Sequence, residues 1–280
     1  DPFAEPHWNG WGNGLANTRF QSAEHAKLKL SDIPNLELKW AYAFPGETFM
    51  ESQPTVVGGR LFMGSPNGTV YALDAKTGCT HWRFKAAAPV KAPVTIGKVG
   101  DNQYAAFFGD QSGRVYSLDA ASGALRWQDV GDDHPSARVT GGVQIHKGKL
   151  YVPMASFEEA LAMAPDYTCC VFRGSVLAYE ADSGKRLWKQ FTIKQEPSPM
   201  GKDTNGKVMH GPSGAAVWSA VTIDAQRQLI YIGTGDNYSN PPSDTSDSVV
   251  ALKLGSGEIA WIYQGLGGDA WNVGCMLKKQ

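Results

Sequence analysis

Charged side chains are scarce in this sequence, and no segment concentrates charge of one sign. Asp, Glu, Lys and Arg make up 19% of the 280 residues, and the formal net charge is −1. Without a run of Lys or Arg, the sequence offers no basic surface for a nucleic-acid partner. Because no apolar run approaches the ~18 residues that cross a bilayer, we expect no membrane span. The chain opens without a charged and then apolar leader, which indicates either a cytosolic protein or the processed form of an exported one.

Cysteine is also rare, and its spacing argues against a structural zinc site. The four cysteines are Cys79, Cys169, Cys170 and Cys275, and no Cys-x-x-Cys pair is present. Cys169 and Cys170 are adjacent. Their Cα atoms would lie ~3.8 Å apart across a trans peptide, below the ~4.4–6.8 Å that is usual for a disulfide. The pair is therefore either a strained disulfide formed in an oxidising compartment or two reduced, buried thiols.

Glycine, proline and tryptophan are plentiful, and tryptophan marks an internal repeat. The sequence has 32 Gly, 16 Pro and 9 Trp. Four segments share an alternating apolar stretch, a Ser/Thr-Gly pair and a Trp four residues after that Gly. Self-similarity of this kind is typical of propellers and other arrays. The copies span 70–82, 115–127, 176–188 and 249–261, and 38–40 resembles the end of one more.

Each copy predicts a β-hairpin. In the first copy, 70–73 alternates as a strand does, and 74–78 has the Asp and Gly of a tight turn. A second strand pair precedes the hairpin, at 54–57 and 60–64 around a Gly-Gly turn. Four strands make one propeller blade, so we predict an all-β propeller of about four antiparallel blades over residues 1–280.

Two insertions lengthen the later repeats. They cover 154–174 in the third unit and 194–215 in the fourth, and Pro, Gly and Ser within 197–214 predict a loop there. Insertions in repeat proteins gather on one face, which is often the binding face.

The repeat resembles the tryptophan-docking motif of the dehydrogenases that depend on pyrroloquinoline quinone (PQQ). The opening 8–20 resembles the entry segment of these enzymes, and 169–175 and 234–239 resemble their polyvinyl-alcohol dehydrogenase branch. The resemblance implies a periplasmic or secreted oxidoreductase that uses PQQ and Ca²⁺. Such an enzyme would oxidise a secondary or polymeric alcohol and pass electrons to cytochrome c. Propellers of this family have eight blades, so the chain resembles an N-terminal half, whose open edges would favour self-association.

The resemblance also assigns residues to the cofactor. Trp218 matches the floor on which the quinone lies, although a packing role is the alternative. Thr140 and Arg173 match groups that bind the cofactor's carboxylates. Cys169 and Cys170 match the disulfide that stacks on the quinone, although the family's cysteines lie in an earlier unit.

Metal ligands are predicted in the same way. Glu158 matches the family's carboxylate ligand for Ca²⁺, with Glu159 as the alternative. Asp236 stands where the family has an Asn ligand, and Asn237 follows it. Oxygen ligands suit a hard cation. The alternatives are a solvated loop glutamate and an Asx turn.

The predicted catalytic base departs from the family pattern. The family has Asp-x-Trp-Asp, and its last Asp is the proposed base, but this chain has Asn272 there. Because an amide cannot take a hydroxyl proton as a carboxylate does, Asp269 is the substitute candidate. This departure keeps a second hypothesis open, in which the chain is a non-catalytic propeller that serves as a protein-binding scaffold.

Overall fold

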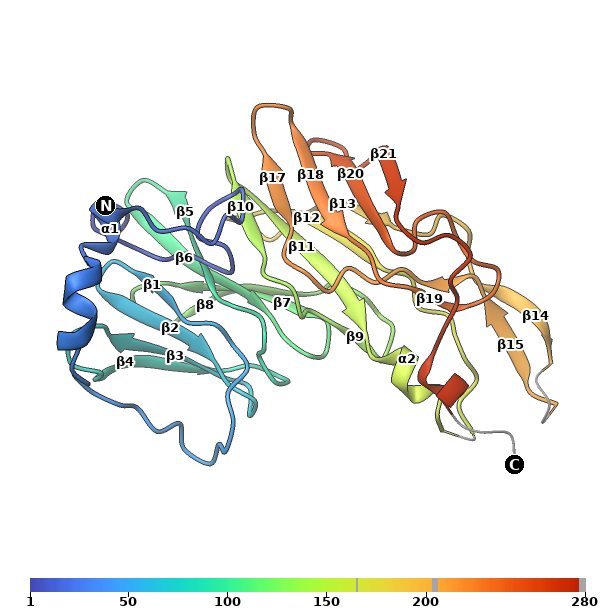
Figure 1. The fold of residues 1–280 in the computed structure, drawn as a ribbon, viewed down its shortest axis with the longest axis horizontal. Helices are drawn as coiled ribbons and strands as arrows, with labels where there is room; N and C mark the ends of the chain where they lie inside the picture. Colours follow the sequence, from blue (N-terminus) through green and yellow to red (C-terminus); the bar gives the residue numbers. More distant parts are fainter. Residues whose placement is uncertain (165, 203–205, 277–280) are drawn as a thin grey trace.

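The computed structural model describes residues 1–164, 166–202 and 206–276, and its strands confirm the all-β prediction. Three four-stranded antiparallel sheets follow the order of the chain, namely β1-β2-β3-β4, β5-β6-β7-β8 and β17-β18-β20-β21. A further sheet, β10-β11-β12-β13, has β9 paired to the end of β11. Figure 1 shows these sheets side by side in an open arc, with the N-terminal sheet at one end and β20–β21 at the other.

The strands of the first two sheets are β1 (Thr55–Val57), β2 (Arg60–Gly64), β3 (Thr69–Asp74), β4 (Thr80–Lys85), β5 (Thr95–Gly100), β6 (Gln103–Gly109), β7 (Arg114–Asp119) and β8 (Leu125–Val130). The next sheet contains β9 (Ala137–Arg138), β10 (Gln144–His146), β11 (Lys149–Ser156), β12 (Ser175–Glu180) and β13 (Arg186–Phe191). The last one contains β17 (Thr222–Asp224), β18 (Leu229–Gly233), β20 (Ser248–Lys253) and β21 (Ile259–Gln264). Short elements are α1 (Ala23–Ala26), η1 (Leu30–Asn35), α2 (Glu158–Leu161), β16 (Ser213–Gly214), β19 (Asn237–Ser239) and η2 (Val273–Met276).

The aspartate predicted in each turn stabilises the repeated hairpins through hydrogen bonds. Asp74 Oδ1 accepts hydrogen bonds from the backbone N–H groups of Lys76 and Thr77 and from the Thr77 hydroxyl. Asp119 forms the same three bonds one sheet later. The carboxylate thus closes the turn before the second strand begins.

The repeat also explains how neighbouring sheets pack. A Cβ added to Gly123 would lie 2.6 Å from Trp82 Cδ2, and one added to Gly184 would lie 2.6 Å from Trp127 Cδ2. Each tryptophan therefore covers the turn glycine of the following sheet, where a side chain has no room. Trp82 Nε1 donates to Ala120 O at 3.1 Å, which fixes the ring over that turn. The repeated Trp and Gly therefore encode the contact between sheets.

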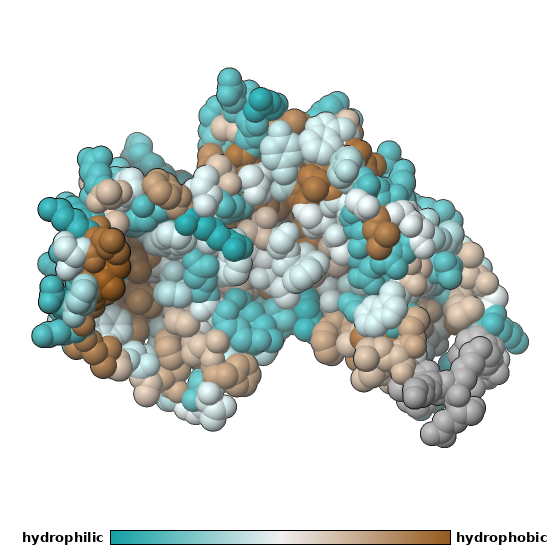
Figure 2. Space-filling view, viewed as in Figure 1, coloured by the Kyte–Doolittle hydropathy of each residue, from teal (hydrophilic) through white to brown (hydrophobic). Residues whose placement is uncertain are grey.

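The core lies between adjacent sheets, and apolar side chains are exposed at the N-terminal end. Phe107, Leu150 and Tyr179 are fully buried in the largest core cluster. By contrast, Leu30 and Leu38 are 86% and 85% exposed. Figure 2 shows the apolar surface over the segment that carries η1. No helix among the described residues is long and apolar enough to cross a membrane.

The two insertions have structures of their own. The first continues β11 to Ser156 and then enters α2. The second was predicted to be a loop, but it contains an antiparallel hairpin, β14 (Ser198–Lys202) and β15 (Val208–Gly211). The prediction was wrong because Pro and Gly at 197–214 were taken to exclude strands. Both strands are exposed along most of their length, so Pro199 and Gly201 fit at the surface, away from a central sheet.

Candidate functional site

A cavity of about 710 Å³ brings together three of the predicted cofactor and metal residues. Thr140 follows β9, Trp218 follows β16, and Asp236 lies between β18 and β19. The Thr140 hydroxyl donates to Trp218 O at 3.2 Å, which joins the two segments. The volume is within the range of small-molecule sites. Its other lining residues are Glu51, Lys91, Gln111, Arg138, Ala155, Ser156, Phe157, Glu159, Ala216, Thr234, Gly235, Tyr238 and Asp247.

Trp218 offers its ring to this cavity and is not a core residue. Its side chain is 64% exposed, whereas Trp82, which docks between sheets, is 8% exposed. A Cβ at Gly235 would meet Trp218 Nε1 at 3.4 Å, so the neighbouring loop passes close to the ring without covering it. A flat, exposed indole inside a cavity is a surface on which a flat ligand can stack.

Arg138 supplies a guanidinium that has no anionic partner among the described residues. Its Cζ lies 4.4 Å from the centre of the Phe157 ring, and Nη1 donates to Gln111 Oε1 at 3.2 Å. Arg138 Nε is buried without a hydrogen-bond partner, and within the described ranges no carboxylate pairs with this side chain. Burial lowers the pKa of Arg138. A half-buried cation with an unsatisfied donor is suited to a carboxylate ligand.

Acidic side chains also line this cavity, among them Glu159, Asp236 and Asp247. Burial raises the pKa of Asp236 to about 6, and the charges of Glu159, Asp247 and Asp269 add to this effect. Burial also raises the pKa of Glu159. Asp236 Oδ2 and Asp247 Oδ2 are buried and have no hydrogen-bond partner among the residues that the structure describes. Mutually repelling carboxylates with unsatisfied oxygens fit a hard cation such as Ca²⁺.

The described residues alone do not complete a metal site. Within the described part of the chain, no group of three or more His, Cys, Asp or Glu side chains forms a ready metal cluster. Ca²⁺ takes six to eight oxygens, so a ligand in the cavity and water would have to supply the remainder.

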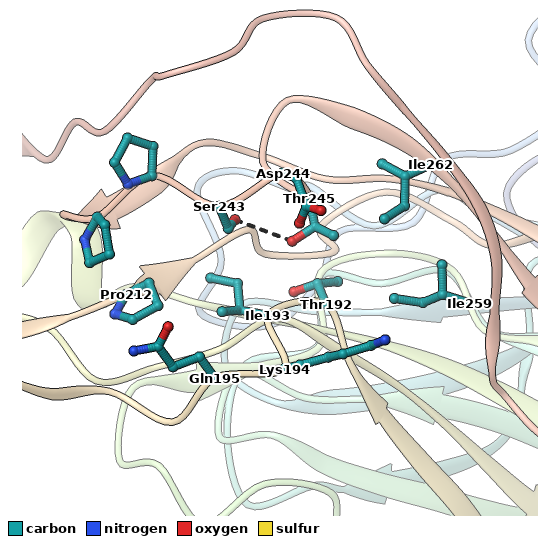
Figure 3. A pocket seen from close by; sticks show the side chains of 12 residues that line it. Thr192, Ile193, Lys194, Gln195, Pro212, Ser243, Asp244, Thr245, Ile259 and Ile262 are labelled. Carbon is teal, nitrogen blue, oxygen red and sulfur yellow. Dashed lines mark hydrogen bonds between the residues drawn. The ribbon is translucent and has the colours of Figure 1, made fainter.

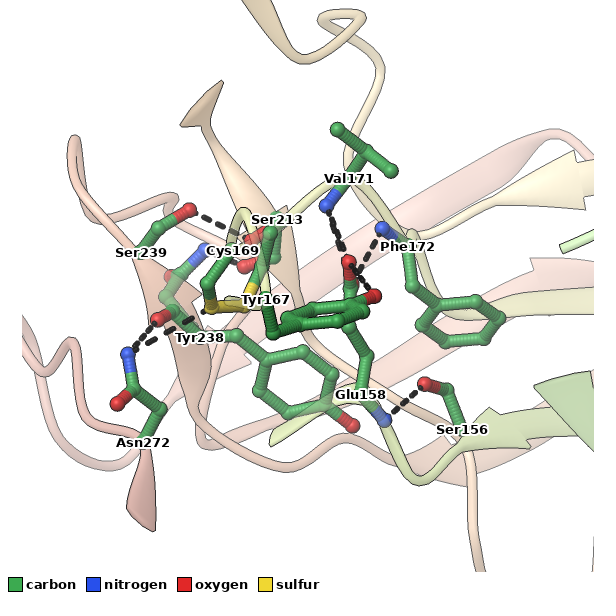
Figure 4. The surroundings of a disulfide bond; sticks show 12 residues. Ser156, Glu158, Tyr167, Cys169, Val171, Phe172, Ser213, Tyr238, Ser239 and Asn272 are labelled. Atoms are coloured by element: carbon green, nitrogen blue, oxygen red, sulfur yellow. Dashed lines mark hydrogen bonds between the residues drawn. A yellow bond between two sulfur atoms is a disulfide. The ribbon is translucent and has the colours of Figure 1, made fainter. Parts of the chain in front are cut away.

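Glu158, the first predicted metal ligand, has a different position. It is fully buried, and its carboxylate accepts the Tyr167 hydroxyl at 2.8 Å and the Phe172 N–H at 2.7 Å. It also accepts the Val171 N–H and lies 3.4 Å from His134 Nε2. Burial by itself would raise the pKa of Glu158, but the interactions with His134 and with the backbone N–H groups of Phe172 and Val171 outweigh burial and lower it. Figure 4 shows these bonds converging on Glu158 beside the cysteine pair.

Glu159 is the next residue on α2, and it lines the cavity that contains Asp236. Successive residues on a helix are turned by about 100°, so one glutamate enters the protein and the other enters the cavity. The alternative ligand considered from the sequence is thus the one that the fold brings to Asp236.

Asn237 and Arg173 also lie outside the cavity. Asn237 is fully buried, donates to Ser213 O at 2.9 Å and accepts the Ser243 N–H at 2.8 Å. The Arg173 guanidinium donates to Ile193 O and Lys194 O at 3.3 and 3.1 Å and covers the Phe191 ring at 4.0 Å. Both side chains fix loops, and neither lines the cavity that contains Trp218.

Cys169 and Cys170 form a disulfide, the first of the two alternatives that their adjacency left open. Cys170 is fully buried in the core, and Cys169 lines a second cavity next to the first. Asn272 lines the same second cavity and donates to Tyr238 O at 2.8 Å. Tyr238 lines both cavities.

A further cavity lies near the end of β13, and none of the predicted site residues lines it. Figure 3 shows Thr192, Ile193 and Lys194 on one side and the Ser243–Thr245 segment on the other. Among its described lining residues, Asp244 is the single acidic one, so they form no acidic cluster comparable to that around Asp236.

Sequence reasoning missed Arg138, although the signal was available. Arg138 stands two residues before Thr140, which was chosen from the same segment. In an extended chain, residues two apart lie on one face. Pairing of Arg138 with Ala155 places this face beside the end of β11.

Comparison with known proteins agrees with this architecture. Residues 8–276 match the family described as PQQ: glucose/ethanol/alcohol dehydrogenase, beta-propeller domain. The chain belongs to this family. It is 42% identical to a polyvinylalcohol dehydrogenase from Pseudomonas sp. over 271 residues, which are 96% of this chain and 42% of that protein. A polyvinylalcohol dehydrogenase from Sphingopyxis sp. is also 42% identical, over 98% of this chain and 42% of its own length.

A solved structure shows the same fold. The quinohemoprotein alcohol dehydrogenase ADHIIG from Pseudomonas putida superimposes with a TM-score of 0.75 at 24% identity, over 96% of this chain and 42% of that one. The four blade-like sheets are therefore part of a β-propeller. The chain spans about two fifths of the length of the relatives it matches.

Proposed function

We propose that this chain forms the cofactor-binding part of a PQQ- and Ca²⁺-dependent dehydrogenase for secondary or polymeric alcohols. The observation that carries the proposal is one cavity that joins an exposed indole, an unpaired guanidinium and a cluster of unsatisfied carboxylates. PQQ is flat and carries carboxylates and quinone oxygens, so each of these groups has a counterpart on it. Family membership and similarity to polyvinylalcohol dehydrogenases support the same conclusion.

The residues would divide the work by chemistry. Trp218 would stack on the ring system, and Thr140 would keep the Trp218 segment in place through its hydrogen bond. Arg138 would bind a carboxylate, the role that the sequence assigned to Arg173. Asp236 and Glu159 would hold Ca²⁺. When bound, PQQ supplies a two-electron acceptor and Ca²⁺ supplies a Lewis acid.

A base must still take the alcohol proton. Asn272 cannot serve, because its amide donates to Tyr238 O and has no basic oxygen of carboxylate strength. Asp269 is the candidate that we propose, since its charge already acts on both Asp236 and Asp247. We further propose an exported, periplasmic location and cytochrome c as the electron acceptor.

Binding of PQQ to the purified chain tests the proposal. Titration with PQQ in the presence of Ca²⁺, followed by quenching of tryptophan fluorescence, should give saturable binding. Trp218→Ala should weaken binding roughly two- to tenfold, because offset stacking is worth ~0.5–1.5 kcal/mol, and Arg138→Gln should weaken it about tenfold or more, because charge-assisted bonds are worth ~1.5–3 kcal/mol. Trp127→Ala and Arg173→Gln are the matched controls, since these side chains lie in packing and loop contacts.

Two outcomes would contradict the proposal. Equal losses in the test and control variants would show that Trp218 and Arg138 act only through the fold. Absence of saturable binding would favour the alternative of a non-catalytic scaffold.

A further inference from the structure

Tyr238 carries a hydroxyl group that the fold does not use. The residue lies on β19, and it is 3% exposed. Its hydroxyl has no hydrogen-bond partner among the described residues, whereas the hydroxyl of Tyr151, which is also buried, donates to Leu254 O at 3.2 Å. Buried hydroxyls are usually hydrogen-bonded. The Tyr238 hydroxyl is therefore available to a group from outside the chain.

The Tyr238 ring is fixed by contacts that do not involve this hydroxyl. The ring stacks on Phe172, with centroids 6.5 Å apart and an interplanar angle of 22°. Its strand, β19, pairs with β16, and Asn272 Nδ2 donates to Tyr238 O at 2.8 Å. Figure 4 shows the hydroxyl pointing away from Cys169. The side chain thus has a defined place in the protein before any ligand binds.

The hydroxyl lies within reach of both kinds of charge in the cavity that contains Trp218. Tyr238 lines this cavity, and its hydroxyl, unlike Arg138 Nε, is not enclosed by the protein. Burial raises the pKa of Tyr238, and the charges of Glu159 and Asp236 raise it further. Arg138 lowers the pKa of Tyr238, and Tyr238 in turn raises that of Arg138. The hydroxyl is therefore close to the acidic side chains and also to the half-buried cation.

We propose that the Tyr238 hydroxyl is a binding group for a flat aromatic ligand on Trp218, and that it donates a hydrogen bond to an oxygen of this ligand. The inference rests on the proposed function for the identity of that ligand as PQQ. A phenol is a hydrogen-bond donor at neutral pH, and quinone and carboxylate oxygens are acceptors. An oxygen at this place would also be attracted by Arg138 and by a cation at Asp236. The hydroxyl gains its partner only when the ligand enters.

Tyr238→Phe tests this role, because it removes the hydroxyl and keeps the ring on Phe172. The hydroxyl has no partner in the free chain, so the melting temperature of the unliganded variant should equal that of the parent chain. Titration with PQQ in the presence of Ca²⁺ should give a Kd roughly three- to tenfold higher than that of the parent chain, through loss of one hydrogen bond. A lower melting temperature with an unchanged Kd would show that Tyr238 serves only packing, and would overturn the inference.

Tyr151→Phe is the matched control. Tyr151 is fully buried in another core cluster, and its hydroxyl is paired within the chain. This variant should lower the melting temperature by a few degrees, because Leu254 O loses its donor, and should leave the Kd for PQQ unchanged. The same rise in Kd in both variants would contradict a specific role for the Tyr238 hydroxyl.

A second probe separates this inference from the proposed function. Terephthalate is a flat aromatic dicarboxylate without a quinone, and calorimetric titration in the presence of Ca²⁺ measures its binding. If PQQ does not bind, but terephthalate binds with a Kd that rises in Tyr238→Phe, the inference stands and the proposed function fails. If PQQ binds the parent chain and Tyr238→Phe equally well, the inference alone is refuted. If neither probe binds the parent chain, both are refuted.

Discussion

Replacing Glu158 and Glu159 one at a time separates a structural carboxylate from a ligand. Glu158→Gln puts an amide NH₂ where a buried carboxylate accepts bonds from Tyr167, Val171 and Phe172. At least one N–H then faces another donor. Charge-assisted bonds contribute ~1.5–3 kcal/mol each, and removing one partner of a buried charged network costs ~3–5 kcal/mol. We therefore expect Glu158→Gln to lower the free energy of unfolding by about 3–5 kcal/mol at pH 7.

The matched variant Glu159→Gln should behave differently. Glu159 lines the cavity, and burial raises its pKa. Loss of its charge therefore removes electrostatic repulsion between Glu159 and Asp236. Its free energy of unfolding should change by less than ~1 kcal/mol. Its effect should appear instead as weaker Ca²⁺-dependent binding of PQQ.

The pH dependence gives an independent check. The folded-state pKa of Glu158 lies below its ordinary value of 4.5, so its stabilising effect is present above that pH. The effect disappears as the pH falls through the folded-state pKa. The difference between the parent chain and Glu158→Gln should therefore shrink below pH ~4.5. Urea unfolding followed by circular dichroism measures both quantities. A loss below ~1 kcal/mol at pH 7 for Glu158→Gln, with a larger loss for Glu159→Gln, would refute the assignment.

Three further predictions concern packing, the disulfide and the acidic cluster. Gly184→Ala should destabilise the chain by ~2–3 kcal/mol more than Gly148→Ala. The two glycines have nearly the same φ, +74° and +73°, but only Gly184 lies under a tryptophan. Equal losses in urea unfolding would show that the tryptophan–glycine contact between sheets does not contribute to stability. Alkylation of the native chain followed by intact-mass measurement should modify only the exposed Cys79 and Cys275, and all four cysteines after reduction; four labels before reduction would contradict the disulfide. Because the pKa of Asp236 is raised to about 6, the metal-free chain should lose about 1–2 kcal/mol of stability as the pH rises from about 4 to 6. Thermal unfolding measures this loss, and Asp236→Asn should remove it. An identical pH profile for the variant would show that Asp236 does not titrate in this range.

The repeat made most of the fold predictable. A hairpin is a local structure, and the Asp, Gly and alternating apolar residues that build it lie within one short segment. The strand pair predicted at 54–57 and 60–64 corresponds to β1 and β2. The β14–β15 hairpin was missed because its strands are exposed, so they lack the alternating pattern that a buried face imposes.

The cavity was predictable only in part. Thr140, Trp218 and Asp236 were chosen from motifs, and the fold brings them together. Arg173 was chosen from its resemblance to the family, and Arg138 was not considered. The sequence around each arginine does not show that Arg173 donates to backbone carbonyls. Nor does it show that Arg138 has no anionic partner among the described residues.

The sequence by itself determined the repeated hairpins and the adjacency of Cys169 and Cys170, because each depends on residues close together or on a spacing repeated along the chain. The tertiary structure alone decided the direction of Glu158 and Glu159, since adjacent residues of identical type carry no local signal to separate them. It also decided that Arg138, Trp218 and Asp236 share one cavity. Arg138 lies on β9, whereas Trp218 and Asp236 lie in loops after β16 and β18, so their proximity arises only when these segments pack together.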